Sequence, residues 1–278
     1  MKKNETDNRF SPTDLERIVS ETFVAQVDYH ETVGSTNDRA LELSPAAEDQ
    51  FPLLVLAESQ TAGRGRGTNQ WWSSCGALTF SVLLATEAAG LPTERWPQVS
   101  LTVGLAVCEA LEELLARGVP TTSLAVLPMA SLKWPNDVYI EGRKICGVLV
   151  EAPRDRQGRL LLGIGINVNN SVNNAPAELK STATALCDLT GRQVALTDAL
   201  IEVLKRLAER LQPSDLWNAQ VREGWRRRCL LTGQKICVDL GVRQSEGVCR
   251  GIDDEGALLL DAEGQVERHF AGVVTRLE

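Results

Sequence analysis

The feature that most constrains the fold of this chain is an apolar stretch, residues 77–85, that contains no charged side chain. It is rich in β-forming residues, which predicts a strand at the centre of a sheet. A second apolar run, residues 53–57, predicts another buried strand shortly before it. The main domain is therefore expected to form around a sheet, with the flanking segments covering it.

Further strands and helices surround these two runs, and their order indicates the fold class. The additional strands are predicted at residues 24–29, 132–134, 138–140, 144–151 and 160–169. The helices are predicted from Ser11-Pro12, from Trp96-Pro97 to a cap at Gly118, from a cap at Thr197 to Leu211, and over 215–230. Because antiparallel strands are interspersed with helices, we expect an α+β fold with a mixed or antiparallel sheet flanked by helices, not a doubly wound sheet.

The sequence changes character after Gly233. Short alternating strands are predicted at 235–240, 246–252, 257–261 and 266–270, with glycine-containing turns between them. Several short strands within so few residues are typical of a small β-barrel of SH3-like size. We therefore expect three parts: a tail and short helix at 1–24, a large α+β domain at 25–230 and a small β domain at 231–278.

Composition narrows the possible classes of function. The net charge is −8 and the pI is near 5.1, whereas general nucleic-acid binders are basic, so arginines that matter must act inside a site. Seven cysteines include no C-x-x-C pair and only two histidines are present, so no zinc site and no metal ligands are predicted. We expect the cysteines to be reduced core residues of a cytoplasmic protein. A signal-peptide pattern and a long apolar run are both missing from the sequence, so no membrane association is expected.

The segment after the second strand, residues 57–72, combines residues suited to an anionic, ring-bearing ligand. Glycine stands at 63, 65 and 67, arginine at 64 and 66, and tryptophan at 71 and 72. Glycine lets the backbone approach a ligand, arginine offers paired donors to a carboxylate or phosphate, and tryptophan offers a flat face for stacking. These residues predict a flexible loop that closes over such a ligand. Taken alone, they are also compatible with a solvated surface loop.

Other short segments place polar side chains at strand or helix ends. The trio at residues 35–37 precedes a helical pattern and either caps that helix or binds a polar ligand group. The segment Lys133-Trp-Pro-Asn-Asp137 brings a cation, an amide and a carboxylate to a bend fixed by proline. The strands that follow carry Lys144, Gly147 and Asn167.

In this order and spacing the segments resemble those of the biotin protein ligase family. The resemblance rests on Gly-Ser-Thr-Asn37, Glu58-Ser-Gln-Thr-Ala-Gly-Arg-Gly-Arg66 with Trp71 following, Lys133-Trp-Pro-Asn-Asp137, Lys144-Ile-Cys-Gly-Val-Leu-Val-Glu151 and Gly163-Ile-Gly-Ile-Asn-Val-Asn169. It extends from about residue 28 to the C-terminus, where Arg250-Gly-Ile-Asp and Gly256-Ala-Leu-Leu resemble that family's small β domain. The resemblance implies a class II synthetase-like catalytic domain followed by an SH3-like domain.

The resemblance implies a reaction and a set of substrates. It joins biotin to ATP as biotinyl-5′-AMP with release of pyrophosphate, and then passes the biotinyl group to one lysine of the biotin carboxyl carrier protein of acetyl-CoA carboxylase. The implied substrates are biotin and ATP, with Mg²⁺ accompanying the nucleotide. Since the attacking groups are the biotin carboxylate and the carrier lysine, positioning and electrostatics would provide the catalysis.

By resemblance, the site residues divide between the two substrates. Lys144, facing the forming acyl-phosphate, and Arg64, binding the carboxylate or phosphate, are the catalytic candidates. The biotin-binding residues would be Ser35, Thr36, Asn37, Gln60, Gly63, Arg64, Gly65, Arg66, Lys144 and Gly147. The nucleotide-binding residues would be Arg66, Trp71, Lys133, Asn136, Asp137, Asn167 and Arg276, with Trp71 stacked on adenine.

The chain departs from the family's pattern in two places. Thr68 and Asn69 stand where the family usually has Gly-Arg, so retention of the intermediate is expected to depend more on Arg64 and Arg66. The single helix ahead of the main domain leaves too little chain for a DNA-binding module. We therefore expect a monofunctional enzyme without DNA binding or a repressor role.

Two other functions are compatible with parts of the sequence. A lipoate or octanoate ligase or transferase would share the catalytic fold, but such proteins lack the paired Gly-Arg-Gly-Arg and Lys-Trp-Pro-Asn-Asp segments. A non-catalytic nucleic-acid binder would use Arg-Gly repeats and tryptophan stacking, which the net acidity disfavours. The oligomeric state is left open, since a free strand edge in the central sheet could pair two subunits into a homodimer.

Overall fold

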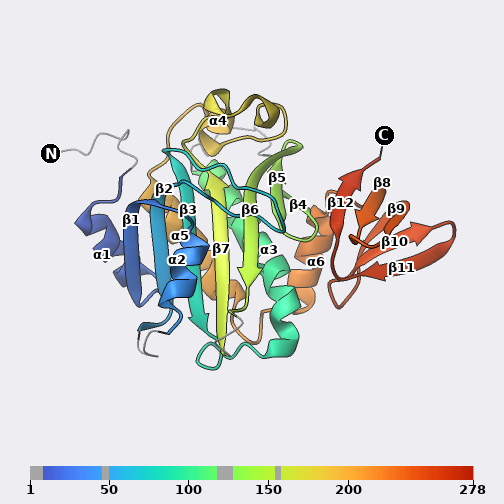
Figure 1. Ribbon diagram of the computed structural model, residues 1–278, viewed down its shortest axis with the longest axis horizontal. Helices are drawn as coiled ribbons and strands as arrows, with labels where there is room; N and C mark the ends of the chain where they lie inside the picture. The colour runs from blue at the N-terminus through green and yellow to red at the C-terminus, as the bar shows by residue number, and fades with distance from the viewer. Residues whose placement is uncertain (1–8, 46–49, 118–127, 154–157, 278) are drawn as a thin grey trace.

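The computed structural model describes residues 9–45, 50–117, 128–153 and 158–277. Two sheets organise the described chain: a large sheet with helices packed on it, and a small sheet near the C-terminus (Figure 1). The α+β class is confirmed, with a mixed sheet of the class II synthetase type and an SH3-like C-terminal part. The bounds of the three predicted parts stay predictions.

The large sheet contains seven strands, and the apolar stretch singled out from the sequence forms an interior strand of it. In spatial order the strands are β1 (Gln26–Val33), β2 (Leu53–Gln60), β3 (Ala77–Ala85), β7 (Arg159–Asn167), β6 (Arg143–Glu151), β5 (Asp137–Ile140) and β4 (Ser131–Lys133). Only β1 and β2 run parallel, and all the other pairs are antiparallel. Every residue of β3 is buried, which confirms the prediction of a central strand.

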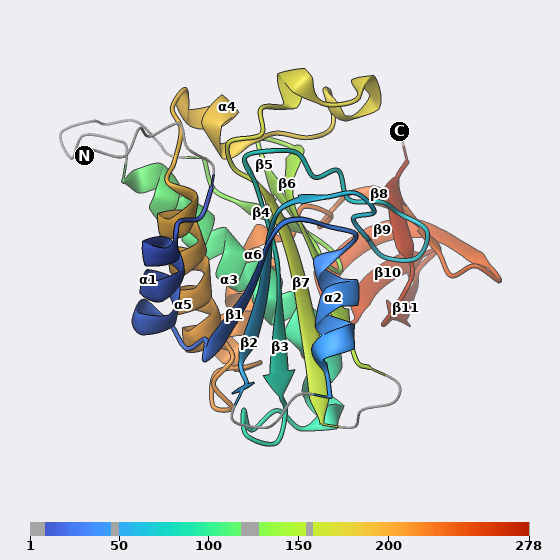
Figure 2. The same cartoon turned by 60° about the vertical axis from the view of Figure 1, so that its left-hand side comes forward.

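Helices cover both faces of this sheet. They are α1 (Pro12–Glu21), α2 (Thr36–Leu43), α3 (Trp96–Ala116), α4 (Leu186–Thr190), α5 (Leu196–Arg210) and α6 (Ala219–Arg228). Helices α1, α3 and α5 lie on one face, whereas α2 lies alone on the other, as Figure 2 shows. Helix α2 contacts β2, β3 and β7, so its N-terminus is fixed over the middle of the sheet.

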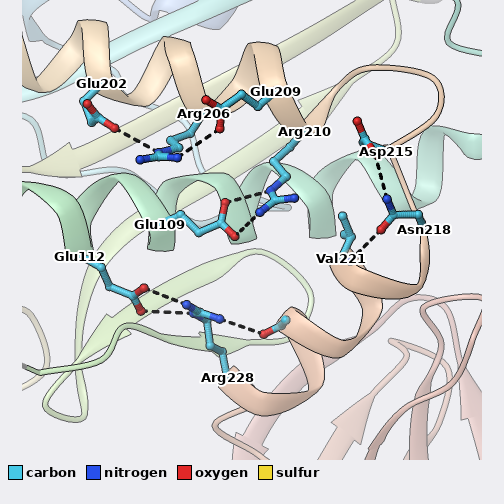
Figure 3. A network of polar contacts seen from close by, with 11 residues as sticks. Glu109, Glu112, Glu202, Arg206, Glu209, Arg210, Asp215, Asn218, Val221 and Arg228 are labelled. Atoms are coloured by element: carbon cyan, nitrogen blue, oxygen red, sulfur yellow. Dashed lines mark hydrogen bonds and ion pairs between the residues drawn. The ribbon is translucent and has the colours of Figure 1, made fainter.

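Ion pairs join the helices of the crowded face. Arg210 binds Glu109 through both Nε and Nη2, at 2.9 and 2.7 Å. Arg228, at the end of α6, binds both carboxylate oxygens of Glu112 on α3, at 3.2 and 2.7 Å (Figure 3). Only 12% of the Arg228 side chain is exposed. These paired contacts orient α5 and α6 on α3 because each arginine presents a planar fork to a carboxylate.

The small sheet is antiparallel and packs beside α6 and the β4 edge of the large sheet (Figure 1). In spatial order its strands are β11 (Gln265–His269), β10 (Leu258–Ala262), β9 (Gln244–Ile252), β8 (Lys235–Asp239) and β12 (Val273–Arg276). The turn at residues 253–256 docks it onto the large domain through two tryptophans. Trp134 Nε1 donates to the Gly256 carbonyl at 3.1 Å, and Trp217 Nε1 donates to the Asp254 carbonyl at 2.8 Å.

Several predicted boundaries are wrong for local reasons. The strand predicted at 24–29 is displaced to β1, because its register is set by pairing with β2. The helix predicted at 215–230 is shorter, since the Asn218 side chain caps it by accepting from the Val221 amide at 3.0 Å. Thr197 is not a cap but lies buried inside α5. The predicted cap at Gly118 lies outside the described residues.

The cysteines are only partly the core residues that were predicted. Four of them are buried: Cys108, Cys146, Cys237 and Cys249. Cys75, however, is exposed, and two others are partly buried. Cys75 follows the tryptophan-containing segment and precedes β3, so its burial is decided by the path of a connecting segment, not by the periodicity of a strand.

Replacing Gly256 tests how closely the small sheet must approach the large domain. Gly256 has φ +88°, and a Cβ there would lie 2.6 Å from Leu101 Cδ1. Gly264 is a matched control, with φ +87° and nothing within 4 Å of an added Cβ. We expect Gly256→Ala to lower the free energy of unfolding by about 1–3 kcal/mol more than Gly264→Ala, because only the first overpacks the contact.

Urea denaturation of both variants, followed by circular dichroism and tryptophan fluorescence, measures this difference. Equal losses in the two variants would contradict the prediction, since only the shared cost of a left-handed backbone would then be present.

Candidate functional site

One pocket gathers most of the residues singled out from the sequence. Its volume is about 370 Å³, within the roughly 300–1,000 Å³ typical of small-molecule sites. The predicted site residues that line it are Ser35, Thr36, Asn37, Gln60, Arg64, Gly65, Arg66, Trp71, Lys133, Asn136, Asp137, Lys144 and Gly147. Val273 and Val274 of β12 line it as well, so the small sheet forms part of its wall.

Two glycines make a flat floor in this pocket. Gly147 on β6 pairs directly with Gly165 on β7. The indole of Trp71 lies against them: a Cβ added to Gly165 would be 2.4 Å from Trp71 Cε2. The Trp71 Nε1 donor is buried without a hydrogen-bond partner. The floor therefore accepts a flat ring, and an unsatisfied donor is present beside it.

The Gly-Arg segment forms a short hairpin in the structure, and its predicted flexibility stays a prediction. Arg64 and Gln70 form an isolated antiparallel bridge, and the Gly65 amide donates to the Asn69 carbonyl at 2.8 Å. Below this bridge the Trp71 amide donates to the Gly63 carbonyl at 2.9 Å. Gly67, at the tip, has φ +65°. These bonds fix the positions at which the loop presents its arginines and Trp71 to the pocket.

The polar trio at the start of α2 faces the pocket instead of capping the helix. Ser35 occupies the N-cap position, but its side chain makes no capping hydrogen bond. The amide and the hydroxyl of Thr36 both donate to Gln60 Oε1, at 2.7 and 3.1 Å. Ser81 Oγ lies 2.8 Å from Thr36 Oγ1 and 2.6 Å from Asn37 Oδ1. This network holds several neutral donors and acceptors in fixed positions at one end of the pocket.

Arg64 and Arg66 have different partners. Arg64 lies between two carboxylates: its Nη1 is 2.5 Å from Asp38 Oδ1, and its Nη2 binds Glu151. Arg66 donates to the carbonyl of Gly272, just before β12, and burial lowers its pKa. One arginine therefore ties the hairpin to the large domain and the other ties it to the small sheet.

Cations gather at the other end of the pocket around one carboxylate. Lys144 Nζ lies 2.7 Å from Asp137 Oδ1 and 5.9 Å from the centroid of the Trp71 ring. Asp137 is the only acidic residue among the described residues that line the pocket. Burial lowers the pKa of Lys133, an effect that Asp137 opposes and that repulsion from Lys144, Arg276 and Arg66 strengthens. This end therefore has an excess of positive charge that suits an anionic ligand.

Three predicted site residues do not line the pocket. Gly63 lies at the base of the hairpin, where a Cβ would be 2.5 Å from the Trp71 carbonyl oxygen. Asn167 is buried, and its amide group is engaged by the Thr184 carbonyl at 3.0 Å and by Asn170 Nδ2 at 2.9 Å. Arg276 donates to the Leu230 carbonyl at 3.1 Å. The ligand contacts predicted for these residues stay predictions.

The sequence reasoning missed three residues that organise the site. Ser81 is hidden in an apolar strand, and only its position opposite Gly163 places it beneath α2. Asp38 and Glu151 both bind Arg64, and Glu151 also accepts from Asn37 Nδ2 at 2.7 Å. Two signals were available: Asp38 directly follows the polar trio, and Glu151 ends the segment that begins at Lys144.

Two further observations concern the described ranges as a whole. Across residues 9–45, 50–117, 128–153 and 158–277, no helix is both long and apolar enough to cross a bilayer. In the same ranges, no group of three or more histidine, cysteine, aspartate or glutamate side chains is arranged to hold a metal ion.

Comparison with known proteins gives consistent matches. Residues 29–169 match the model of the biotin/lipoate A/B protein ligase family. A biotin–acetyl-CoA-carboxylase ligase from Mycobacterium tuberculosis is 32% identical over 91% of this chain and 89% of that protein. The bifunctional ligase/repressor BirA from Bacillus subtilis is 31% identical over 97% of this chain and 78% of that protein. A solved structure of biotin protein ligase from Aquifex aeolicus in complex with biotin and ATP has a TM-score of 0.73 and 31% identity, covering 91% of this chain and 99% of that chain.

The burial of Lys133 leads to a prediction about stability. Burial disfavours the charged form, so its pKa in the folded protein lies below the ordinary value of 10.5. Below the folded pKa both states are protonated and the folded state bears the full desolvation cost. As the pH rises through the folded pKa toward about 10.5, the unfolded state binds more protons and this cost disappears.

Lys133→Met should therefore raise the denaturation midpoint at pH 7, and the gain should shrink as the pH approaches about 10.5. Thermal melting at pH 7, 9 and 10.5 measures it, with Lys235→Met, at an exposed position, as the control. A gain that does not change with pH would mean that packing, not charge, is responsible.

Proposed function

This chain belongs to the biotin/lipoate A/B protein ligase family, and we propose that it activates biotin with ATP and transfers the biotinyl group to a lysine of a biotin carboxyl carrier protein. Relatives that match over most of this chain are biotin–acetyl-CoA-carboxylase ligases. A solved structure of similar fold contains biotin and ATP. These similarities favour biotin over lipoate as the acid that is activated.

The observation that carries the proposal is the division of one pocket into two chemically different ends. Neutral donors and acceptors around Thr36 and Gln60 occupy one end. Partly buried cations around Asp137 occupy the other. The glycine floor and Trp71 lie between them. A ligand made of a neutral ring system joined through an anionic centre to a second ring matches this order, and biotinyl-AMP is such a ligand.

The first chemical step requires two anions to approach each other. The biotin carboxylate attacks the α-phosphate of ATP, forming the acyl-phosphate bond while the bond to pyrophosphate breaks. Lys144 would stabilise the charge that develops on the α-phosphate, and Lys133 and Arg66 would offset the repulsion between the reactants. Asp137 holds Lys144 in place at 2.7 Å, which limits the reorganisation needed during the reaction.

The neutral end of the pocket suits the fused ureido and tetrahydrothiophene rings of biotin. Ser35, Thr36 and Gln60 would bind the ureido group, whose oxygen and N–H groups need both donors and acceptors. Gly147 and Gly165 would let the Trp71 ring lie close to the sheet beside the bicyclic ring, since a Cβ at Gly165 would overlap the Trp71 indole. Arg64 would contact the biotin carboxylate or the phosphate, exchanging part of its pairing with Asp38 and Glu151.

The nucleotide would occupy the cationic end. Trp71 would stack on the adenine ring, with Asn136 and Asp137 facing the nucleotide. Arg276 lies on β12, and its charge acts on Lys133, so it would reach the nucleotide from the small sheet. Mg²⁺ would be held mostly by the phosphates and water, for which one or two protein carboxylates suffice. Asp137 is suited to that role and lines the pocket.

The intermediate must be kept from water until the carrier lysine arrives. The hairpin at residues 63–71 covers one side of the pocket, and Arg66 ties it to Gly272 beside the small sheet. Attack by the lysine amine on the acyl carbon then forms an amide and releases AMP. Because the reaction consumes ATP, we place it in the cytoplasm.

We propose a homodimer, because the large sheet has an edge strand that could pair with a second copy of the chain. The large sheet has two edge strands, β1 and β4. Residue Cys229 forms a bridge to Leu132 along β4, so β1 is the edge that we propose for pairing with a second copy. Sedimentation with and without biotin and ATP tests this pairing.

Biotin-dependent exchange between ATP and pyrophosphate is the experiment that tests the proposed function. We expect exchange with biotin and none with lipoate, followed by biotin transfer to a purified carrier domain but not to its lysine-to-arginine variant. Exchange with lipoate alone would establish the other branch of the family instead. Loss of both exchange reactions would contradict any acyl-adenylate function.

Lys144→Met should lower the kcat of adenylate formation by roughly 100-fold to 1,000-fold, as for removal of a donor that stabilises transition-state charge. The KM for biotin should change much less, because the neutral end of the pocket is untouched. Arg143→Met is the control: it removes a neighbouring cation whose partner is Glu141, at 3.9 Å. A similar kcat for both variants would remove Lys144 from the catalytic role.

Arg64→Ala should increase the rate at which biotinyl-AMP leaves the pocket, by about tenfold or more, since hydrogen bonds to charged groups contribute about 1.5–3 kcal/mol. With Thr68 and Asn69 in place of a Gly-Arg pair, Arg66 would be the remaining loop arginine. A pulse-chase of labelled intermediate measures retention. Arg250→Ala, which breaks an exposed pair with Asp261 at 2.6 Å, should leave it unchanged. Equal retention in all three proteins would sink the prediction.

A further inference from the structure

Two connecting segments leave the large sheet at the same end. The segment 61–76, which contains the hairpin, runs from the end of β2 to the start of β3. Strand β7 ends beside that start, because Ala77 pairs with Asn167, and the segment 168–185 continues from there (Figures 1 and 2). The Asn169 amide donates to the Gly76 carbonyl at 2.8 Å. The two segments are therefore joined where they begin.

The segment 168–185 returns to hold the backbone of Lys144. Strand β7 pairs with β6 only as far as Cys146, and Ala183 continues the pairing by forming a parallel bridge with Lys144. The Lys144 amide donates to the Thr182 carbonyl at 2.8 Å, and the Thr184 amide donates to the Lys144 carbonyl at 2.9 Å. Both backbone groups of the catalytic candidate are thus bound by this segment.

Trp72, which directly follows the hairpin, packs on the same segment. It lies with Leu179 against a small apolar cluster whose buried members are Val172, Ala175 and Ala183. This cluster is separate from the main core, so its packing supports the segment locally. Ala183 belongs to the cluster and also bridges to Lys144. A single residue therefore connects Trp72 with the backbone of Lys144.

The two adjacent tryptophans act on different parts of Lys144. The Trp71 ring faces the side chain, with its centroid 5.9 Å from Nζ. Trp72 supports the segment that binds the Lys144 backbone, and it is not among the described residues that line the pocket. Because the Trp71 amide is bonded to the Gly63 carbonyl, both rings depend on the position of the hairpin.

We propose that Trp72 is a positioning residue for Lys144, an inference that rests on the proposed function. By filling the apolar cluster, Trp72 holds residues 182–184 against β6 and so fixes the Lys144 ammonium beside Asp137. A smaller side chain would leave a cavity, and the segment would separate from β6 more often. A cation that stabilises a transition state must already be in place when the charge develops, so this loosening would slow the reaction.

Hydrogen exchange tests the structural part of the proposal without any ligand. In Trp72→Leu the Lys144 and Thr184 amides should exchange about tenfold faster or more, because their acceptors lie in the loosened pairing. The Val148 amide, which donates to the Asn136 carbonyl at 2.9 Å further along β6, should keep its rate. Trp72→Phe should restore most of the protection. Trp96→Leu removes another partly buried tryptophan, packed on the main core, and should leave the Lys144 and Thr184 amides unchanged.

A double-mutant cycle on biotin-dependent ATP–pyrophosphate exchange tests whether Trp72 acts through Lys144. Trp72→Leu should lower kcat by roughly 10-fold to 100-fold with little change in the KM for biotin, as expected for a misplaced catalytic group. In the Lys144→Met background the same change should have almost no further effect on kcat, because the group that it positions is gone. Trp72→Phe should restore most of kcat.

Two results would overturn the proposal. Unchanged hydrogen exchange at Lys144 and Thr184 in Trp72→Leu would show that Trp72 does not hold the pairing. An equal loss of kcat in both backgrounds would show that Trp72 acts on something other than Lys144. A parent protein without ATP–pyrophosphate exchange would contradict the proposed function instead, and hydrogen exchange would then still decide whether Trp72 holds the strand of Lys144.

Discussion

The register of three central strands decides what the pocket can hold. Gly165 on β7 faces Thr79 on β3 and Gly147 on β6, and Gly163 faces Ser81. A Cβ at Gly163 would lie 2.1 Å from Asn37 Oδ1, and one at Gly165 would strike the Trp71 ring. The missing side chains thus create the space for α2 and for the hairpin. A shift of one residue would turn these positions to the other face of the sheet and close the pocket.

The cationic end of the pocket has more positive charge than burial would favour, because desolvation disfavours charged groups. Lys133 is desolvated and surrounded by other cations, with Asp137 as the compensating carboxylate. Arg64, in contrast, is fully compensated by Asp38 and Glu151. Uncompensated buried charge is destabilising, and it is the cationic end that bears this cost. Such a distribution is expected where a phosphate-bearing ligand supplies the missing negative charge.

The sequence was informative where a pattern is local and incomplete where contacts are distant. Residues 77–85 predicted a central strand because they are apolar and rich in β-forming residues. The Lys133–Asp137 segment predicted a bend because it contains a proline. The start of α6 was predicted too early, at residue 215, because Asp215 and Asn218 are both residue types that cap helices. Ser81, Asp38 and Glu151 could not be assigned, since each acts on residues brought near only by sheet pairing or by the hairpin. The hairpin itself depends on the Asn69 carbonyl, which accepts from the Gly65 amide. The sequence marks Asn69 only as a position where the family usually has arginine.

Trp134 has a consequence for how the chain can be divided. It stands between Lys133 and Asn136 and lines the pocket with them, and its indole donates to the Gly256 carbonyl in the small sheet. One short segment therefore shapes the binding surface and anchors the C-terminal strands. Replacing the small sheet with that of another protein would remove the contact between Trp134 and Gly256, and with it a support of the binding surface. Because both parts depend on the segment around Trp134, neither is expected to be exchangeable as an independent domain.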